Sequence, residues 1–462
     1  MVHIEITKGL NIPIKGGPIG TPKSLVPGGE TSFFSPSQIA LDLSEFSDLK
    51  LRLLVKAGDP VKIGDPLAED KASPGRFFVA PAGGIINDIV RGLRRVPTRI
   101  VIDVAKDHEE YRLFPTLNPS NATREDLVNL LKNAGIFTCI RQRPFNVLAD
   151  LTKIPRSIFV KAIESAPFVP SAEMQVEGFE KEFQLGLDAL SVLTPGVVHL
   201  VYRNDSPFKA FSSAKNVTKH TAEGPHPIAN SSLHIEKIDP IETVDAIIWT
   251  LSARDVVAIG YLLTHGRCYH QKVISVAGPA LLPEKMGYFK VREGFPIFPL
   301  ISGRVPKGHV RLISGDLLMG KTVSAQDFLG FSHTAVCALP ENAEREFLHF
   351  FRLGTDKYSF SRAYLSGHFN NQDRQYDFTT SLHGEPRPFI DSTLYDEVMP
   401  LDVPTMLLVK AVMAEDYDLA VNLGLLEVDS EDFALPTFVC PSKMEMTDII
   451  KNGLQAYAKE MS

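Results

Sequence analysis

Strand patterns and helix patterns alternate between residues 120 and 266, and this alternation constrains the fold more than any other feature of the chain. The stretch at 121–126 opens an amphipathic helix, with Thr123 or Asn121 as its cap and acidic side chains in its first turn. The further elements predicted here are a strand at 157–163, a helix at 176–192, strands at 197–203 and 234–238, and a helix at 253–266. Alternation at this spacing predicts a parallel, doubly wound sheet.

The regions on either side have a different pattern. Two Gly-Asp-Pro turns, at 58–60 and 64–66, interrupt short strands in the first part of the chain, a pattern similar to the flattened barrel of biotinyl and lipoyl carriers. After residue 266 the sequence is strand-rich again, with strands predicted at 271–280, 285–294, 309–318 and 346–354. The tail carries apolar residues at helical spacing, at 405–424 and 447–461.

A chain of 462 residues is too long for a single core, so these patterns predict several domains. We expect an α/β multi-domain protein. Its predicted parts are a barrel-sandwich hybrid, lipoyl-like domain at 1–105, a Rossmann-like parallel α/β domain at 106–266, a β-grasp, SLBB-like domain at 267–380 and a helical C-terminal domain at 381–462.

The charge balance limits the classes of partner. A formal net charge of -7 argues against nucleic acid, because phosphate binding needs a clustered positive face. The densest basic run is Arg91, Arg94, Arg95 and Arg99. A single short run of this kind is typical of a solvated face or a docking surface.

The four cysteines predict no metal site. Cys139, Cys268, Cys337 and Cys440 lie far apart, so neither a four-thiolate iron–sulfur site nor a zinc ribbon can be drawn. Their pattern suits a reducing compartment. No apolar run approaches the ~18 residues that a membrane span needs. If the protein works with a membrane, we expect it to do so through partner subunits.

Residues Gly315–Thr322 match the P-loop pattern, in which Lys321 would reach the outer phosphates of a nucleotide and Thr322 would hold magnesium. The strand before the motif fits. The stretch at 323–331 makes a poor helix, because Val323 is β-branched and Gly330 interrupts it. The context therefore favours a glycine-bearing turn, and a nucleotide-binding protein that uses Gly315–Thr322 stays open as the alternative.

Two weaker motifs have simpler interpretations. Lys71, in a Glu-Asp-Lys-Ala stretch, resembles the modified lysine of a lipoyl carrier, but the strand before it is short, and a surface lysine is the simpler interpretation. His265, Cys268 and His270 have metal-like spacing on a helix-to-strand turn. No second cluster supplies a fourth ligand, so a helix C-terminus with favourable basic side chains is the preferred interpretation.

Several stretches together resemble one family across nearly the whole chain, the A subunit of the sodium-pumping NADH:quinone reductase. The stretches that carry the resemblance are 8–18 (KGLNIPIKGGP), 66–96, 135–145 (GIFTCIRQRPF), 162–171 (AIESAPFVPS), 224–227 (GPHP), 271–279 (QKVISVAGP), 312–320 (LISGDLLMG), 396–412 and 437–446 (TFVCPSKMEM). Each stretch alone is weak, and their order and breadth make the match specific. The resemblance places the P-loop match in a β-grasp turn.

This family is in turn similar to the flavin-binding subunit of respiratory complex I, and the comparison implies lost cofactors. The glycine-rich flavin loop corresponds here to 134–145, which keeps one glycine and carries Phe137, Ile140 and Arg141 in the space. The strand end at 161–167 keeps one acid, Glu164. The region that would hold an iron–sulfur cluster keeps only Cys440, with Pro436 at a position where the family commonly has cysteine.

The resemblance implies a non-catalytic, peripheral subunit of a membrane complex that couples NADH oxidation and ubiquinone reduction to Na+ export. It would lie on the cytoplasmic face of the bacterial inner membrane, among other subunits that include integral membrane ones. NADH, flavins and iron–sulfur clusters would be bound by those subunits, and no metal or catalytic residue is expected here. Ubiquinone is the one ligand considered for this chain, in a pocket at the emptied flavin cleft lined by Phe137, Arg141, Phe145 and Glu164.

Overall fold

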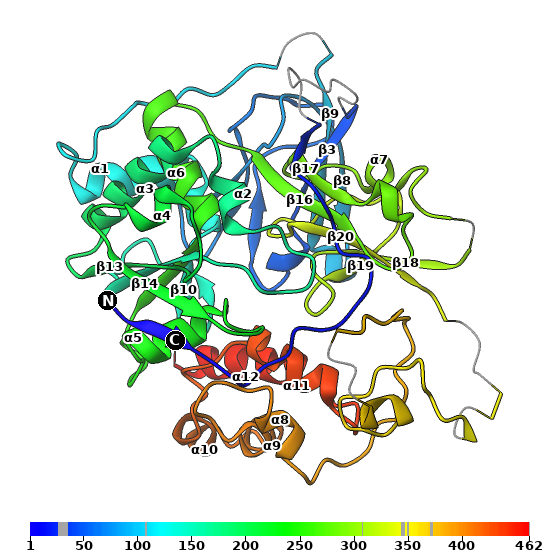
Figure 1. The fold of residues 1–462 in the computed structure, drawn as a ribbon. Helices are drawn as coiled ribbons and strands as arrows, with labels where there is room; N and C mark the ends of the chain where they lie inside the picture. The colour runs from blue at the N-terminus through cyan, green and yellow to red at the C-terminus, as the bar shows by residue number, and fades with distance from the viewer. Residues whose placement is uncertain are drawn as a thin grey trace.

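The computed structural model describes residues 1–25, 36–106, 109–306, 308–342, 347–348, 351–369 and 373–461. Its largest sheet has seven strands (Figure 1). In spatial order they are β1 (His3–Glu5), β14 (Thr218–Glu223), β13 (Val197–Arg203), β12 (Ser157–Ala162), β15 (Ile248–Ser252), β10 (Arg141–Arg143) and β11 (Val147–Leu148). The five strands from β1 to β15 pair in parallel, whereas β10 and β11 are antiparallel to their neighbours.

Helices lie before, between and after the parallel strands. Thr123 caps α1 (Arg124–Asn133) in a capping box with Asp126, as the sequence predicts for this position. Two long helices, α3 (Glu180–Leu193) and α6 (Ala253–His265), pack closely where Gly260 lies against the backbone of Glu182. A Cβ at Gly260 would lie 1.7 Å from the Glu182 carbonyl oxygen, so only glycine allows this approach. The shorter helices are α2 (Ala172–Val176), α4 (Lys209–Ser212), α5 (Ser231–Ile238) and α7 (Ile297–Ile301).

One predicted strand is wrong, and one falls partly beyond the described residues. Residues 234–238 lie in helix α5, where Leu233, His234 and Ile235 are consecutive buried residues. The order of polar and apolar residues over these five positions resembles the alternation of a strand, but five residues are too few to distinguish a strand from a helix. The strand that precedes α6 is β15, which the sequence analysis missed. The strand predicted at 346–354 lies in part outside the described residues, and its described residues, 347–348 and 351–354, form no strand.

Two small sheets form the barrel region. One contains β3 (Gln38–Asp42), β9 (Pro97–Val104), β8 (Gly84–Arg91) and β5 (Pro60–Val61), and the other contains β4 (Leu51–Leu53), β6 (Pro66–Asp70) and β7 (Phe77–Val79). The inward side chains of both sheets, such as Ile39, Leu67, Phe78 and Ile100, share one buried cluster. A flattened barrel can enclose a core of this size because alternate side chains of each strand face inward.

The first 25 residues do not follow the predicted 1–105 boundary. Strand β1 pairs with β14 of the seven-stranded sheet, and β2 (Lys23–Ser24) pairs with β17 of another sheet. Figure 1 shows this N-terminal segment running past the C-terminal helices from one sheet to the other. A short strand pairs with whichever sheet edge is open, and the sequence of the strand does not specify which edge that is.

The third sheet has six strands in the order β19 (Lys321–Val323), β18 (Val310–Ser314), β20 (Ala335–Pro340), β16 (Gln271–Ala277), β17 (Gly287–Arg292) and β2. It overturns the P-loop alternative. Strands β18 and β19 pair antiparallel, so Gly315–Gly320 is the turn of a hairpin. Lys321 and Thr322 lie exposed on β19 and begin no helix. A phosphate-binding loop needs a helix N-terminus after the glycines, and none follows here.

The C-terminal helices lie against one face of the seven-stranded sheet (Figure 1). They are α8 (Thr393–Asp396), α9 (Thr405–Met413), α10 (Tyr417–Asn422), α11 (Ala434–Val439) and α12 (Met446–Glu460). Leu408 of α9 and Leu454 of α12 belong to the same buried cluster as Phe159 of β12, so this region has no core separate from that sheet. The helix predicted at 405–424 is broken where Glu415 takes a φ of 56°.

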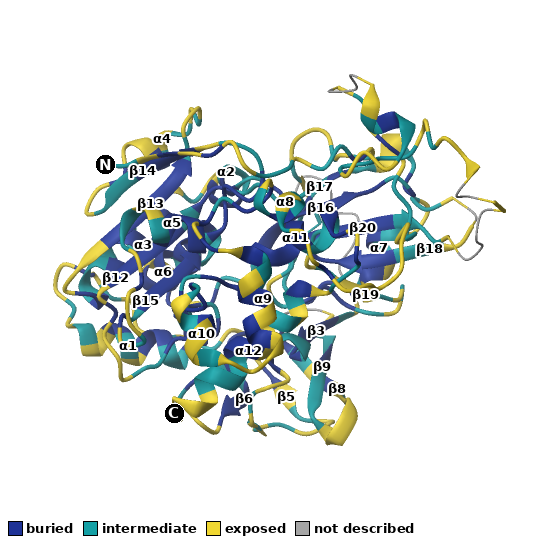
Figure 2. Ribbon diagram, turned by 90° about the horizontal axis from the view of Figure 1, so that it is seen from below, coloured by how far each residue is buried: buried dark blue, intermediate teal, exposed yellow. Residues whose placement is uncertain are grey.

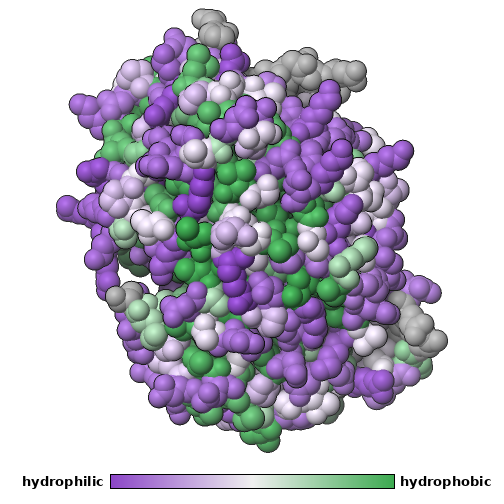
Figure 3. All heavy atoms as spheres, turned by 90° about the vertical axis from the view of Figure 1, so that its left-hand side faces the viewer, coloured by the Kyte–Doolittle hydropathy of each residue, from purple (hydrophilic) through white to green (hydrophobic). Residues whose placement is uncertain are grey.

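Burial and hydropathy follow this layered arrangement. The central strands of the seven-stranded sheet are mostly buried while the outer faces of the helices are exposed (Figure 2), and hydrophilic and hydrophobic side chains are interspersed on the face drawn in Figure 3. None of the helices in the described part of the chain is both long enough and apolar enough to cross a membrane.

Candidate functional site

A cavity of about 590 Å³ opens at the carboxyl ends of β12 and β15. Strands β13 and β14 follow β12 on one side, whereas β15 lies on its other side, so the chain changes direction across the sheet at this point. Ligands of open α/β sheets bind in the crevice outside the strand ends at such a switch point. All four regions of the chain contribute to the wall, from Glu45 in the barrel region to Leu454 in α12.

One end of the cavity carries a lysine and two carboxyl groups. Lys161, near the end of β12, forms an ion pair of 3.1 Å with Glu164, and Glu431 faces the same space from the turn 430–433. Burial works to lower the pKa of Lys161, but Glu164 and Glu431 outweigh it and hold that pKa above its usual value. Burial raises the pKa of Glu164 against the attraction of Lys161.

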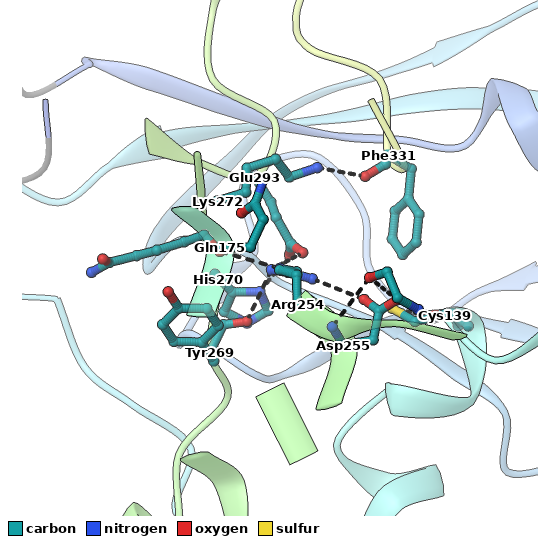
Figure 4. A network of polar contacts seen from close by, with 12 residues as sticks. Cys139, Gln175, Arg254, Asp255, Tyr269, His270, Lys272, Glu293 and Phe331 are labelled. Carbon is teal, nitrogen blue, oxygen red and sulfur yellow. Dashed lines mark hydrogen bonds and ion pairs between the residues drawn. The ribbon is translucent and has the colours of Figure 1, made fainter. Parts of the chain in front are cut away.

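The other end of the cavity holds a closed ionic network, drawn in Figure 4. Arg254 follows the Ser252 cap of α6, and its guanidinium lies 2.5 Å from one oxygen of Glu293. The other oxygen of Glu293 lies 2.7 Å from Nδ1 of His270. Burial alone would raise the pKa of Glu293, but Arg254, His270 and Lys272 outweigh it and hold that pKa far below its usual value. Glu293 is therefore an anion.

Further contacts hold Arg254 and Lys272 in place. The guanidinium of Arg254 donates to the carbonyl oxygens of Gln271 and Tyr269, at 3.2 and 3.3 Å, and lies 5.6 Å from the ring centroid of Tyr269. The ammonium of Lys272 donates to the carbonyl of Phe331 at 2.7 Å (Figure 4). Burial lowers the pKa of Lys272. These contacts occupy the donors of both side chains, so this end of the site is rigid.

The barrel region closes the cavity from a third side. Glu45 accepts hydrogen bonds from the backbone and the hydroxyl of Ser332, at 3.0 and 2.5 Å, and lies 3.8 Å from His333. Burial works to raise the pKa of Glu45, but His333 and Ser332 outweigh it and hold the pKa below its usual value. Phe46 beside it packs edge-on against Phe331 at 5.1 Å. The barrel and the six-stranded sheet thus meet at the cavity wall.

Apolar side chains cover the wall between the two polar ends. They include Phe46, Phe145, Leu251, Leu318, Met319 and Phe331. A cavity of this size with apolar walls and a few polar groups is typical of a site for a small organic molecule.

The structure brings three of the four predicted pocket residues to this cavity. Arg141 lies in its wall, with the guanidinium 5.5 Å from the Phe46 ring, and Phe145 and Glu164 line it as well. Phe137 is fully buried and contacts Trp249 edge-on at 5.6 Å, outside the lining. Phe137 lies in the turn Ile136–Thr138, where Thr138 lines the cavity and Phe137 points into the core, a difference that the sequence alone does not determine.

The remaining glycine of the loop 134–145 serves packing against the barrel. Gly135 has a φ of 76°, and a Cβ there would lie 3.0 Å from the carbonyl oxygen of Phe77 and from Val79. Larger side chains therefore cannot fit at this position. Ile136 and Ile140 are buried on either side of Phe137. The loop is filled by hydrophobic side chains where a cofactor phosphate would need open backbone.

The weaker motifs do not form a site. Lys71 is exposed in the turn between β6 and β7. The exposed His265 stacks on Tyr261 at 4.1 Å, Cys268 is buried, and His270 contacts Glu293. Across the described ranges, no group of three or more His, Cys, Asp or Glu side chains is placed to hold a metal ion.

The charged residues of the cavity that the sequence analysis missed include Arg254, Lys272, Glu293 and Glu431. Arg254 could have been found, because it stands in the first turn of a well-capped helix that follows a buried strand. Lys272 and Glu293 lie on or beside strands of the six-stranded sheet, and Glu431 lies in a turn near the C-terminus. No local pattern indicates that those three side chains meet the end of β12.

Three family models match successive parts of the chain. Residues 4–105 match the NqrA N-terminal barrel-sandwich hybrid domain. Residues 122–268 match the NqrA second alpha/beta domain, and residues 273–325 match the NQRA C-terminal domain. The barrel-sandwich and β-grasp expectations for the first and third regions agree with these matches, as does an α/β second domain.

Curated relatives match the chain over nearly its full length. The A subunit of the Na(+)-translocating NADH-quinone reductase from Chlamydia caviae is 36% identical, with 99% of this chain and 97% of the relative covered. The corresponding protein from Saccharophagus degradans is 34% identical, with 99% and 100% covered. Among solved structures, a chain of the NAD+-reducing NiFe-hydrogenase covers 49% of this chain and 48% of its own length at 12% identity and a TM-score of 0.35, and nothing is inferred from a likeness of that extent.

Proposed function

The chain belongs to the family of A subunits of the Na(+)-translocating NADH-quinone reductase, and from this membership we propose the role of the protein in the complex. It is a peripheral subunit without a catalytic site of its own, in an assembly that couples NADH oxidation and ubiquinone reduction to Na+ export. Its partners are the other subunits, including integral membrane ones, and it lies on the cytoplasmic face of the inner membrane. Flavins and iron–sulfur clusters are bound by those partners.

We further propose that the chain binds the ubiquinone headgroup in the cavity at the ends of β12 and β15. The observation that carries this proposal is the position of the cavity at the switch point, combined with its apolar wall between two polar ends. A quinone ring is flat and apolar and has a carbonyl oxygen at each end of the ring. Such a ligand needs apolar contact along the ring and a hydrogen-bond donor at a carbonyl oxygen, and the apolar wall and the group of Lys161, Glu164 and Glu431 can supply these.

The architecture proposed for this role is a Rossmann-like second domain that has lost its flavin, flanked by three supporting regions. The parallel order β14-β13-β12-β15 supports the Rossmann-like part, and the clustering of α8 to α12 near the C-terminus supports a helical part at 381–462. The four-part division at 105, 266 and 380 stays a proposal, amended by the pairing of β1 and β2 with other sheets.

The test uses the only tryptophan of the chain, Trp249, whose neighbours Thr250 and Leu251 line the cavity. Titration of a short-chain ubiquinone should quench the Trp249 emission in a saturable manner, because a quinone ring in the cavity would lie close to the indole. Met319→Asp places a charge in the apolar wall and should weaken binding by roughly tenfold or more.

Met413→Asp is the matched control, because Met413 is 52% exposed at the end of α9 and lies away from the cavity lining. Its affinity for the quinone should equal that of the unchanged protein. Absence of saturable quenching, or equal affinity in the Met319 and Met413 variants, would exclude this cavity as the quinone site.

A further inference from the structure

We propose that Glu431 is the proton-holding group of the cavity and that its carboxylic acid donates a hydrogen bond to a carbonyl oxygen of the bound quinone. This inference rests on the quinone-binding function proposed above and names the residue that would select for a carbonyl ligand. It starts from the placement of Glu431 among groups whose own hydrogen bonds are already made.

The two aspartates on either side of Glu431 are held by donors. Asp429 accepts hydrogen bonds from the backbone of Ser430 at 2.7 Å and from the side chain of Asn146 at 2.5 Å. Asp432 accepts from the backbone of Asp429 and from the side chain of Asn230, each at 2.8 Å. In contrast, no hydrogen-bond donor contacts the Glu431 carboxyl within the described residues. This carboxyl is therefore available to a ligand.

The charges around Glu431 oppose a second anion at this end. Lys161 is the cation with the larger influence on Glu431, and Glu164 already pairs with it at 3.1 Å. Arg143 is less available, because its guanidinium donates to the Ser232 hydroxyl at 3.0 Å and to the Glu427 carbonyl at 3.1 Å. The other charged or titratable groups in the wall near this end are His226, Asp316, Asp429 and Lys451, with Asp432 behind Glu431.

These surroundings determine the protonation state. Burial raises the pKa of Glu431 to about 8, with Asp429 and Asp432 adding to the rise and Lys161 and Arg143 opposing it. At neutral pH Glu431 is then a carboxylic acid, with one O–H that it can donate. A carboxylate in the same place would repel a quinone carbonyl, because both groups only accept hydrogen bonds.

Glu293 at the opposite end cannot serve in this way. Its two oxygens accept from Arg254 and His270 (Figure 4), and it has no proton to give. Two lysines near this end also carry donors: the ammonium of Lys161 is directed to Glu164, and Lys451 is exposed to solvent. Glu431 is therefore the group withdrawn from solvent at this end that can offer a donor to a ligand carbonyl without breaking an existing ion pair.

The experiment measures the affinity of the full-length chain for a short-chain ubiquinone from pH 6 to 9.5, by Trp249 quenching. Oxidised ubiquinone has no titratable group, so any pH dependence belongs to the protein. The affinity should be constant well below pH 8 and should fall by up to tenfold per pH unit above it, as Glu431 loses its proton. Glu431→Gln keeps an N–H donor that does not titrate, so its affinity should stay at the low-pH value throughout.

Two further variants separate a hydrogen bond from a structural effect. Glu431→Ala removes the donor and should bind roughly two- to tenfold more weakly than the unchanged protein at pH 6. Asp48→Asn is the matched control, since Asp48 is an exposed carboxyl in the cavity wall, and it should keep the full pH dependence. Unchanged melting temperatures of the variants at pH 6 would show that each of them is folded.

The outcomes distinguish the two proposals. Saturable binding that does not change with pH, or a pH dependence that persists in Glu431→Gln, overturns the role of Glu431 and leaves quinone binding standing. No saturable binding by the unchanged protein at any pH overturns quinone binding and this inference with it. As an independent readout, the infrared band of a carboxylic acid should disappear between pH 7 and 9.5 in the unchanged protein and be absent from Glu431→Gln.

Discussion

The two polar ends of the cavity contain the same residue type in opposite states. Glu293 lies between Arg254 and His270, at 2.5 and 2.7 Å, and its pKa is held far below the usual value. Glu431 shares one lysine with Glu164, and its pKa is raised to about 8. Both carboxyls are removed from bulk water, so burial alone does not decide their charge. The number of N–H donors aimed at each carboxyl decides it.

The difference in charge state gives the two ends of the cavity different roles, a structural role at the Glu293 end and a reactive role at the Glu431 end. The network around Glu293 gives both oxygens of the carboxylate a partner, and the contacts of Arg254 with Gln271 and Glu293 join β16, β17 and the start of α6. The end around Lys161 has more acidic than basic side chains, and Glu431 at this end can release or take up a proton. Perturbed carboxyls of the second kind are the ones that concentrate at functional sites.

The largest expected effect is on the stability of the Glu293 end. Glu293→Gln leaves Arg254 and Lys272 buried without their anion and should lower the free energy of unfolding by roughly 3–5 kcal/mol. Glu431→Gln replaces a group that is already neutral at pH 7, so its effect should stay within about 1 kcal/mol. Urea unfolding at pH 7 measures both changes. Equal losses in the two variants would contradict the assignment of opposite charge states.

Removal of the cation at the reactive end should have a smaller effect. In Lys161→Met, Glu164 loses its partner and takes up a proton, at a cost of roughly 1–3 kcal/mol in stability. The infrared carboxylic acid band at pH 7 should then grow, because two buried acids replace one. Lys272→Met is the control at the other end, where Arg254 and His270 still hold Glu293 as an anion, and the band should not change. A similar increase in both variants would refute the comparison.

The pH dependence of stability should differ in sign between the two carboxyls. From its ordinary pKa of 4.5 up to about 8, Glu431 binds a proton in the folded chain but not in the unfolded one, so its contribution to stability falls as the pH rises. Glu293 contributes stability above pH 4.5 that is lost as the pH falls below that value. For each carboxyl, the free energy of unfolding should change by at most about 1.4 kcal/mol per pH unit.

Urea unfolding between pH 4 and 9, for the unchanged protein and for Glu431→Gln, isolates the first of these contributions as the difference between two curves. The difference in free energy of unfolding between the two proteins should fall with pH up to about pH 8 and be constant above it. No slope between pH 5 and 8 would mean that Glu431 is ionised in the folded chain as well as in the unfolded one.

The smallest effect on stability is expected for a substitution outside both polar ends of the cavity. Lys321→Ala changes an exposed side chain on β19 and should alter the free energy of unfolding by less than about 0.5 kcal/mol. It should also leave the quinone affinity unchanged, because Lys321 is absent from the cavity lining. Calorimetry with ATP and magnesium should detect no binding in either protein. A loss of nucleotide binding in the variant would restore the P-loop interpretation.

Local patterns in the sequence predicted the elements that build the cavity floor. The cap at Thr123, the strand at 157–163 and the helix at 253–266 follow from capping and from apolar periodicity, which act over a few residues. The family resemblance added Arg141, Phe145 and Glu164, which line the cavity. The direction of the Phe137 side chain could not be predicted from the sequence, because it depends on packing against Trp249, which lies on a strand more than a hundred residues later.

The reactive end was beyond sequence reasoning for a related reason. Glu431 has a raised pKa because burial, together with Asp429 and Asp432, outweighs the attraction of Lys161 and Arg143, and this balance exists only in the folded chain. In the sequence it is one of three acids within four residues, which is typical of a solvated turn. The pairing of β1 with β14 was equally hidden, since three residues carry too little pattern to specify a partner strand.

That pairing has a consequence for synthesis of the chain on the ribosome. Strand β1 ends at Glu5 and its partner β14 ends at Glu223, so more than two hundred residues must be added after β1 before the two can meet. At about 5–20 residues per second, β1 waits for roughly 10–45 seconds. During that time its neighbours on the ribosome are the barrel strands, with which it has no native pairing. Completion of the seven-stranded sheet is therefore a late event, and a fusion or tag at the N-terminus would interfere at that step.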